Sequence, residues 1–431
     1  MNDAIDFVTG DNTGLRIPTH RDALIEAGPE WLTQALRAFG TIDATNAVTA
    51  IAGIEPCPGG STGKKFFLTL DYAHDGPGLE RRLFLKFSRD FDDERRDWQR
   101  TEMEGEAKFV ALSRQSGFPI RVPRGWFADY HAASGSGVVI TECIAYGQGG
   151  IEPHRRKCMD HETMADPLPY YRASVSALAR LAAAHKAGRL APDIEARFPW
   201  DPVAGSADLI RYSASELDEE LERCFAFARD CPRLLPEDVR TPAFMAKMRA
   251  DAHRIREEEA RIRAFLASDS RLIALNHWNS HIDNCWFWHD AEGLHCGLID
   301  WGRVGQITFG SALWGGLSAA HHDVWNHHLD GLLALFAAEY AGHGGPVVSA
   351  AEVKRHLTLH MAAMGVARVL AFPEIIRFRL PRCTEASGPH DAMFRDVDPA
   401  RNCLSVYTVF LQHWLREDFG AALDSLHTRS R

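Results

Sequence analysis

The sequence lacks several features that would place it in a class at once. Its nine cysteines are odd in number and contain no CxxC pair, so neither a disulfide framework nor a common zinc motif is expected. Positive charge is in deficit, because 48 Lys and Arg stand against 58 Asp and Glu, for a net charge of -10. Nucleic acid and anionic membrane surfaces are therefore not the expected partners.

Long apolar runs are also missing. No stretch approaches the roughly 20 apolar residues that a membrane span needs. The first ten residues offer neither a basic start nor a signal-peptide apolar run. Internal repeats and low-complexity segments are absent too, which argues against solenoids and linker-rich arrays. We expect a cytoplasmic protein without a membrane span, whose thiols are reduced and mostly buried.

The chain is long enough for two or three domain-sized units, with 431 residues of which 45% are apolar. Its pattern changes once along the chain. The first part has strand-like runs at 48–54, 66–72, 83–87 and 138–142. One helix is expected among them, at about 97–115. The part beyond Gly150 is helical, with helices expected at about 168–186, 242–267, 349–372 and 399–423.

One short strand-like insert, 272–299, interrupts the helical part. Asn279 and Asn284 stand on a loop that leads into its strand 285–288, and a turn then returns the chain to Asp300. Such a hairpin brings Asn284 and Asp300 close together. An amide oxygen and a carboxylate are hard ligands suited to Mg²⁺. The sequence therefore predicts that these two residues bind a magnesium ion.

The loop 277–284, which reads His-Trp-Asn-Ser-His-Ile-Asp-Asn, and the later Ile299-Asp300-Trp301 resemble a known pair of motifs. They look like the catalytic loop and metal segment of the aminoglycoside phosphotransferase and choline kinase superfamily. Pro29-Glu30-Trp31-Leu32 is similar to the entry helix of its longer, ecdysteroid-kinase-like branch. The resemblance runs nearly from end to end. It implies an α+β, bilobal protein-kinase-like fold, with a small antiparallel β-sheet lobe over 1–145 and a larger, mainly helical lobe over 146–431.

The resemblance also implies a nucleotide site in the first lobe. The glycine-rich loop 59–63 looks like the loop that covers the phosphates of ATP, since glycine lets backbone N–H groups come close. Lys86 resembles the strand lysine that neutralises the phosphates, and Glu106 its partner on the helix, with Glu102 and Glu104 as alternatives. ATP and Mg²⁺ are the cofactors implied, and the residues expected to bind the nucleotide are Gly60, Ser61, Thr62, Gly63, Lys86, Glu106 and the hinge acid Glu142.

Two departures from the family's pattern matter most. Asn279 stands where the family has its catalytic Asp, and Trp278 where it has Gly. An Asn amide can orient a hydroxyl but cannot accept its proton, and general-base assistance is typically worth about 10²- to 10⁴-fold. Asp283, where the family usually has Gly, is a candidate substitute for the base. In the family reading, His277 braces the loop.

The sequence therefore predicts a phosphotransferase that uses ATP and Mg²⁺ and acts on a hydroxyl of a small-molecule alcohol. The residues expected near the reaction are Asn279, Asp283 and His277, with Asn284 and Asp300 on the metal. Asn279 leaves open a second hypothesis, a nucleotide-binding pseudokinase with a regulatory or binding role. A third is a zinc hydrolase that would use histidines such as His277 and His281. No feature of the sequence specifies the acceptor or the oligomeric state.

Overall fold

The computed structural model describes residues 5–59, 62–96 and 100–427. The chain forms two compact units. The first contains the residues up to Ile151 together with two later segments, Leu190–Phe198 and Gly297–Val304. The second contains Glu152–Arg189, Pro199–Cys296 and the residues from Gly305 onward. The sequence predicts a single division at 145/146, whereas in the structure Asp300 lies in a segment that belongs to the first unit.

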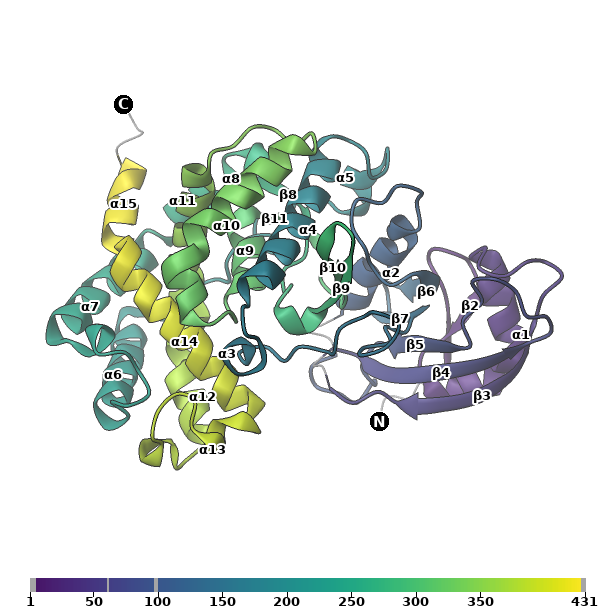
Figure 1. Cartoon of the computed structure of the whole chain (residues 1–431), viewed down its shortest axis with the longest axis horizontal. Helices are drawn as coiled ribbons and strands as arrows, with labels where there is room; N and C mark the ends of the chain where they lie inside the picture. Colours follow the sequence, from purple (N-terminus) through teal and green to yellow (C-terminus); the bar gives the residue numbers. More distant parts are fainter. Residues whose placement is uncertain (1–4, 60–61, 97–99, 428–431) are drawn as a thin grey trace. The chain divides into compact units, whose positions relative to one another are not determined.

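A five-stranded antiparallel sheet forms the centre of the first unit, in the order β3-β4-β5-β7-β6 (Figure 1). Its strands are β3 (Val48–Pro56), β4 (Lys64–Tyr72), β5 (Arg82–Phe87), β6 (Gly125–His131) and β7 (Ser136–Glu142). The sequence predicts four of them and misses β6. This strand contains the fully buried Asp129, whose carboxylate accepts hydrogen bonds from the backbone of Asn12 and Thr13. A charged residue at a buried position hides the strand pattern.

Three helices and a small hairpin complete the first unit. They are α1 (Arg21–Ala38), α2 (Glu102–Ser113), α5 (Ile194–Arg197) and the strands β1 (Phe7–Thr9) and β2 (Arg16–Pro18). α1 packs against β3 (Figure 1) and is kinked at Gly28, whose φ of 69° suits glycine. The helix predicted over about 97–115 is the shorter α2, and residues 97–99 lie outside the described part of the chain.

The second unit is mainly helical. Its helices are α3 (Asp160–Thr163), α4 (Leu168–Lys186), α6 (Ala214–Asp230), α7 (Pro242–Glu257), α8 (Glu259–Ala267), α9 (Phe309–Leu317), α10 (His322–Gly342), α11 (Ala350–Arg368), α12 (Phe372–Arg379), α13 (Ala392–Arg395), α14 (Asp398–Glu417) and α15 (Phe419–His427). Two antiparallel pairs accompany them, β8 (Ile273–Asn276) with β11 (Gly305–Thr308) and β9 (Cys285–Asp290) with β10 (Gly293–Leu298). Short 3₁₀ turns are η1 (Asp238–Arg240), η2 (Ser270–Leu272), η3 (Ile282–Asn284), η4 (Val369–Ala371) and η5 (Cys383–Glu385). The predicted α+β architecture, with a small antiparallel sheet in one unit and a larger, mainly helical second unit, is confirmed.

Two of the predicted helices are divided in the structure. The helix expected over 242–267 is interrupted at Glu258, and the last helix is interrupted at Asp418, whose φ of 48° is left-handed. Ser349 and Glu352 form a capping box at the start of α11. Pro373, expected to follow the end of that helix, instead lies in the first turn of α12, a position where its missing N–H costs nothing.

One stretch corrects the expectation that nothing approaches a membrane span. Within the described ranges, Ala350–Arg379 is the single helical stretch whose length and apolar composition would suffice for crossing. Of its apolar window, 61% is buried inside the protein. A core helix of a folded unit passes the same test, so this stretch is weak evidence for a membrane.

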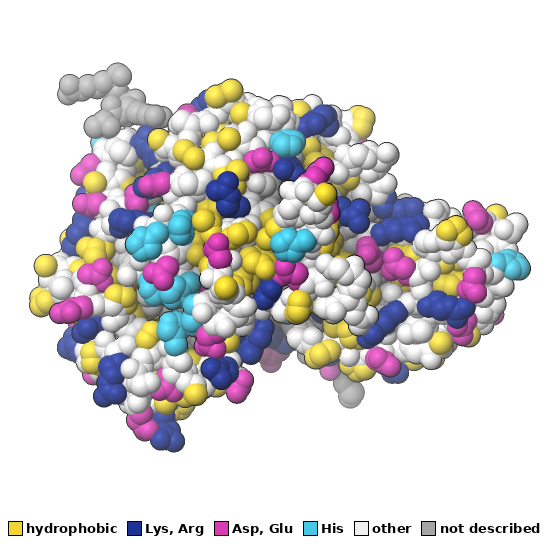
Figure 2. Space-filling view, viewed as in Figure 1, with side chains coloured by type: hydrophobic (Ala, Val, Ile, Leu, Met, Phe, Trp, Pro, Cys, Tyr) yellow, Lys and Arg dark blue, Asp and Glu magenta, His cyan; other side chains and the backbone are white. Residues whose placement is uncertain are grey.

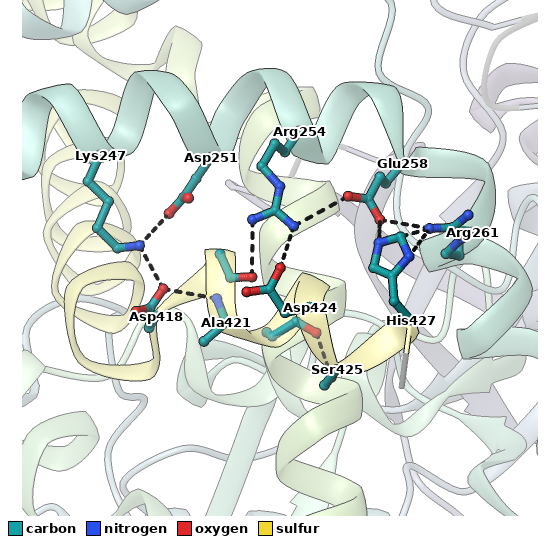
Figure 3. Close-up of polar contacts among 12 residues, drawn as sticks. Lys247, Asp251, Arg254, Glu258, Arg261, Asp418, Ala421, Asp424, Ser425 and His427 are labelled. Carbon is teal, nitrogen blue, oxygen red and sulfur yellow. Dashed lines mark hydrogen bonds and ion pairs between the residues drawn. The ribbon is translucent and has the colours of Figure 1, made fainter. Parts of the chain in front are cut away.

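Ion pairs fasten the last helix to α7 and to the start of α8 (Figure 3). Lys247 contacts Asp418 at 2.6 Å and Arg254 contacts Asp424 at 2.7 Å, while Nε2 of His427 lies 2.8 Å from Glu258. One face of α15 thus follows one face of α7 through charged side chains.

Candidate functional site

Lys86 lies at the centre of a buried charge cluster in the first unit. β5 carries this lysine, which is only 1% exposed. Its Nζ donates hydrogen bonds to Glu106 Oε2 at 2.6 Å and to Asp300 Oδ1 at 2.9 Å. Burial alone would lower the pKa of Lys86, but the carboxylates of Asp300 and Glu106 outweigh burial and raise it. Lys86 is therefore a fixed cation at neutral pH.

The structure distinguishes the three acids of α2 that compete for Lys86. Glu106 is the one that contacts it, whereas Glu104 forms an ion pair with Lys108 at 2.6 Å. Glu102 is also buried, and burial raises its pKa against the attraction of Lys86. Positions four residues apart share one helix face. Glu102 and Glu106 thus present two acids toward the lysine, and Glu106 reaches it.

The backbone around Asp300 has an unusual conformation. Asp300 and Arg303 have φ angles of 62° and 63°, in the left-handed region that non-glycine residues seldom adopt. Trp301 stacks on Phe109 of α2 with ring centroids 3.8 Å apart, and its Nε1 donates to the Leu298 carbonyl at 2.9 Å. Such backbone strain persists only where the surroundings enforce it and is concentrated at functional sites. α2 therefore holds both Lys86, through Glu106, and the Asp300 segment, through Phe109.

The end of the glycine loop lies directly over the cluster. Gly63 has a φ of 62°, and a Cβ there would overlap the Phe87 carbonyl oxygen and come within 3.3 Å of Lys86 Cε. Only glycine fits such an approach. The Thr62 hydroxyl donates to Asp300 Oδ1 at 3.4 Å. Gly60 and Ser61, which the sequence assigns to the same site, lie outside the described residues.

Lys65 is a member of the cluster that the sequence analysis missed. It lies on β4 directly opposite Lys86 on β5, so the two side chains share one face of the sheet. Burial lowers the pKa of Lys65, and the charge of Lys86 lowers it further, while Asp300 and Glu106 oppose both effects. The position of Lys65, two residues after the end of the glycine loop, could have indicated that it lies near the phosphate-binding cluster.

In the second unit, the backbone of the loop 277–284 is held on two sides. His277 is buried, and its Nδ1 accepts a hydrogen bond from the Asn279 N–H at 3.0 Å. Asn284 donates from Nδ2 to the Asn279 carbonyl at 2.8 Å, which leaves the amide oxygen as the group a cation would need. A Cβ on Gly315 of α9 would overlap the Trp278 carbonyl, so α9 packs tightly on the loop.

Asp283 lies on η3 beside a basic residue. One carboxylate oxygen is 3.6 Å from Lys157 Nζ, and the other, Oδ1, has no hydrogen-bond partner among the residues that the structure describes. His281 contacts the Ser318 hydroxyl at 2.8 Å, and burial keeps its pKa far below the ordinary value. In the described part of the chain, neither His277 nor His281 belongs to a group of three potential metal ligands, so the zinc-hydrolase hypothesis gains no support.

Glu142 ends β7 and is engaged with the backbone. Its carboxylate accepts from the Arg124 N–H at 3.1 Å, and its own N–H donates to the Arg124 carbonyl at 2.8 Å. Burial, together with the nearby charge of Glu142, raises the pKa of Glu80 to about 7.

The two residues predicted to bind Mg²⁺ belong to different units, because Asp300 lies in the first and Asn284 in the second. Their shared magnesium ion stays a prediction.

The sequence matches no protein-family model and no curated protein. Comparison with solved structures finds small-molecule kinases. A choline kinase from Cryptosporidium parvum is 11% identical, with a TM-score of 0.44, over 86% of this chain and 92% of its own. A choline/ethanolamine kinase family protein from Mesorhizobium loti is 15% identical, with a TM-score of 0.40, over 92% and 98%.

A spectinomycin phosphotransferase, solved with ADP and spectinomycin, is 12% identical, with a TM-score of 0.40, over 84% of this chain and 94% of its own. These matched structures carry the names of the group that the sequence resembles, while the ecdysteroid-kinase-like branch stays a prediction. With TM-scores below 0.5, these matches support no conclusion about this chain, so the functional assignment rests on the site's own residues.

Proposed function

We propose that this chain is an ATP- and Mg²⁺-dependent phosphotransferase that acts in the cytoplasm on a hydroxyl of a small-molecule alcohol. The observation that carries the proposal is the buried cluster of Lys86, Glu106 and Asp300 beneath Gly63. A buried ion pair is a poor source of stability, because the cost of removing two charges from water can exceed their attraction. A cluster that nevertheless keeps a lysine charged beside a glycine loop favours a role in binding phosphate.

In this proposal each residue of the first unit has one task. Lys86 binds phosphate oxygens of the nucleotide, and Glu106 keeps its ammonium group in place. Backbone N–H groups of the loop 60–63 cover the phosphates. Lys65, on the same sheet face, adds positive charge toward them. The donor set of Asp300 and Asn284 consists of hard oxygens and therefore suits Mg²⁺, which when bound would neutralise phosphate charge.

The second unit supplies the acceptor side of the reaction. The Asn279 amide orients the acceptor hydroxyl, and the hydrogen bond from its backbone to His277 fixes its place. Asp283 takes the hydroxyl proton, because a carboxylate can accept it and an amide cannot. Lys157 Nζ lies 3.6 Å from the Asp283 carboxylate. His277 positions the loop and takes no proton.

The experiment that tests the proposal separates binding from transfer. Thermal unfolding is measured with ATP and Mg²⁺ for the unaltered chain, for Lys86→Met, and for Lys108→Met as the matched control on the outer face of α2. Because a ligand that binds only the folded chain raises the melting temperature, we expect a rise in the parent and the control and none in Lys86→Met. A rise of equal size in Lys86→Met would overturn the nucleotide site.

Transfer is then assayed against a panel of amino alcohols, aminocyclitols and sterols. Asp283→Asn should lower turnover by about 10²- to 10⁴-fold, the usual worth of a general base, and Asn279→Asp should raise it. Asn279 also favours a second function, that of a pseudokinase which binds nucleotide without transfer. If Asn279→Asp binds ATP and still phosphorylates no member of the panel, the enzyme proposal fails and the pseudokinase stands.

A further inference from the structure

The second unit contains a cavity of about 240 Å³ that the proposed function does not use. α3, the start of α10, the segment before α13 and α14 surround it. Four histidines line it: His161, His321, His322 and His390. Figure 2 shows histidine side chains gathered on the face where α3 and α14 lie. The three segments that carry them, at 161, 321–322 and 390, are far apart in the sequence, so only the fold brings them together.

Three of the imidazole rings lie at separations that suit one shared ion. The ring centroid of His161 is 5.1 Å from that of His321 and 3.8 Å from that of His390, and His321 and His390 are 5.6 Å apart. With Zn–N bonds of about 2.0–2.1 Å, rings on one tetrahedral zinc have centroids about 5 Å apart. Two of the three distances match this value. The third, 3.8 Å, is shorter, and it involves His390, which is exposed and precedes α13 by a short turn.

Unsatisfied polar atoms border the same space. Nε2 of His161 and Nε2 of His321 are buried and have no hydrogen-bond partner in the described part of the chain. Asp160 is fully buried, and its Oδ1 also has no hydrogen-bond partner among the described residues. Its other oxygen accepts from the Tyr171 hydroxyl at 3.0 Å and from the His321 N–H at 2.7 Å. Buried polar atoms are normally paired, and an ion between the imidazoles would provide the missing partner.

Acidic groups complete the arrangement. The ligand atoms of His161, Glu162 and His390 lie within 4.8 Å of one another, and those of His321, His322 and Asp323 form a second such group beside them. Glu162 Oε1 is 3.5 Å from His161 Nε2, and the second carboxylate oxygen of Glu162 pairs with Arg395 at 3.3 Å. Asp160 Oδ1 lies 4.0 Å from His161 Nδ1, which is beyond a hydrogen bond but close enough for the carboxylate charge to attract the ring N–H. Three nitrogens and one oxygen in such a set favour Zn²⁺ over Mg²⁺.

We propose that His161, His321, His390 and Glu162 bind one divalent transition-metal ion, with Zn²⁺ as the ion that fits the donor set. Asp160 acts as a positioning residue, because it faces His161 Nδ1 and holds the His321 backbone at the same time. The ion ties α3 to the start of α10 and to the segment before α13. Its binding therefore stabilises the second unit, since the ion binds the folded chain. The proposal is independent of the phosphotransferase assignment.

The test titrates the full chain, stripped with a chelator, first with Co²⁺ and then with Zn²⁺. We expect mass spectrometry to show one ion per chain. Bound Co²⁺ should give the strong visible absorption of a tetrahedral site, and this absorption should disappear when Zn²⁺ displaces the Co²⁺. His161→Ala and His321→Ala should weaken binding by at least about 100-fold, because loss of an outer orienting partner alone costs about 10- to 100-fold. Asp160→Asn should weaken metal binding by about 10- to 100-fold.

Two further variants keep the test clear of folding defects. His390→Ala removes an exposed ligand, so the chain should keep its circular dichroism spectrum while losing the tetrahedral Co²⁺ absorption. His327→Ala, an exposed histidine further along α10, is the matched control and should bind as the parent does. Absence of a bound ion in the parent, or unchanged binding in His390→Ala and His161→Ala together, would overturn the site.

Discussion

Two sets of ion pairs in this molecule look alike by distance and differ in their surroundings. Lys86 contacts Glu106 at 2.6 Å in the first unit, and Lys247 contacts Asp418 at 2.6 Å in the second (Figure 3). The side chains of the first pair are 2% and 7% exposed, and those of the second are 34% and 50% exposed. Equal separation therefore does not mean equal energy, since water screens the second pair.

The difference indicates what each set does. The buried cluster fixes one geometry, because removing any partner leaves a charge in a low-dielectric interior. The surface pairs between α7 and α15 locate the last helix, and each contributes little, since exposed pairs are typically worth about 0–1 kcal/mol. A functional site needs the first kind of arrangement, whereas a docked helix can use the second.

The largest expected effect is that of Lys86→Met on stability. The substitution leaves the buried Glu106 carboxylate and the partly exposed Asp300 carboxylate without their counter-charge, which should cost about 3–5 kcal/mol. Urea unfolding at low and high salt measures the loss, and the cost should change little with salt. The double variant with Glu106→Gln should recover part of it, because one uncompensated charge is gone. A loss that salt abolishes would place this cluster with the surface pairs.

Asp251→Ala should have an intermediate effect. Asp251 is 5% exposed and accepts from Trp414 Nε1 at 3.0 Å as well as from Lys247 at 3.1 Å. Its removal leaves the buried indole N–H unpaired, at a cost of about 1–3 kcal/mol. The matched control is Arg254→Ala, which breaks the exposed pair with Asp424 and should cost under about 1 kcal/mol. Equal losses in the two variants by urea unfolding would break the comparison.

The smallest effect concerns Glu80, a half-buried acid without a full counter-charge. Burial and the charge of Glu142 raise its pKa to about 7, and Arg124 offsets this only in part. The folded chain thus binds the proton more tightly than the unfolded chain, so stability falls as pH rises from about 4.5 to about 7. Glu80→Gln should melt higher than the parent at pH 8 and not at pH 4. Glu55→Gln, on the exposed part of β3, should show no such pH dependence.

Local chemistry allowed much of the fold to be predicted. The capping box at Ser349, the strand runs and the glycine loop before two lysines act over a few residues, so they can be read directly from the chain. The family resemblance implied that Lys86 pairs with an acid of the following helix and left Glu102, Glu104 and Glu106 as candidates. By contrast, β6 escaped prediction because Asp129 is buried by contacts with residues 12 and 13. Asp418, at the break between α14 and α15, contacts Lys247 of another helix.

The sequence by itself determined the two kinds of architecture along the chain and the residue types of the Lys86 cluster, because periodicity and short motifs reflect local interactions. Only the tertiary structure decided that Glu106 rather than Glu104 reaches the lysine, that Lys65 joins it, and that His161, His321 and His390 surround one cavity. Those choices depend on side chains from distant segments that meet in a water-poor interior, where burial and pairing, rather than sequence spacing, determine the energy.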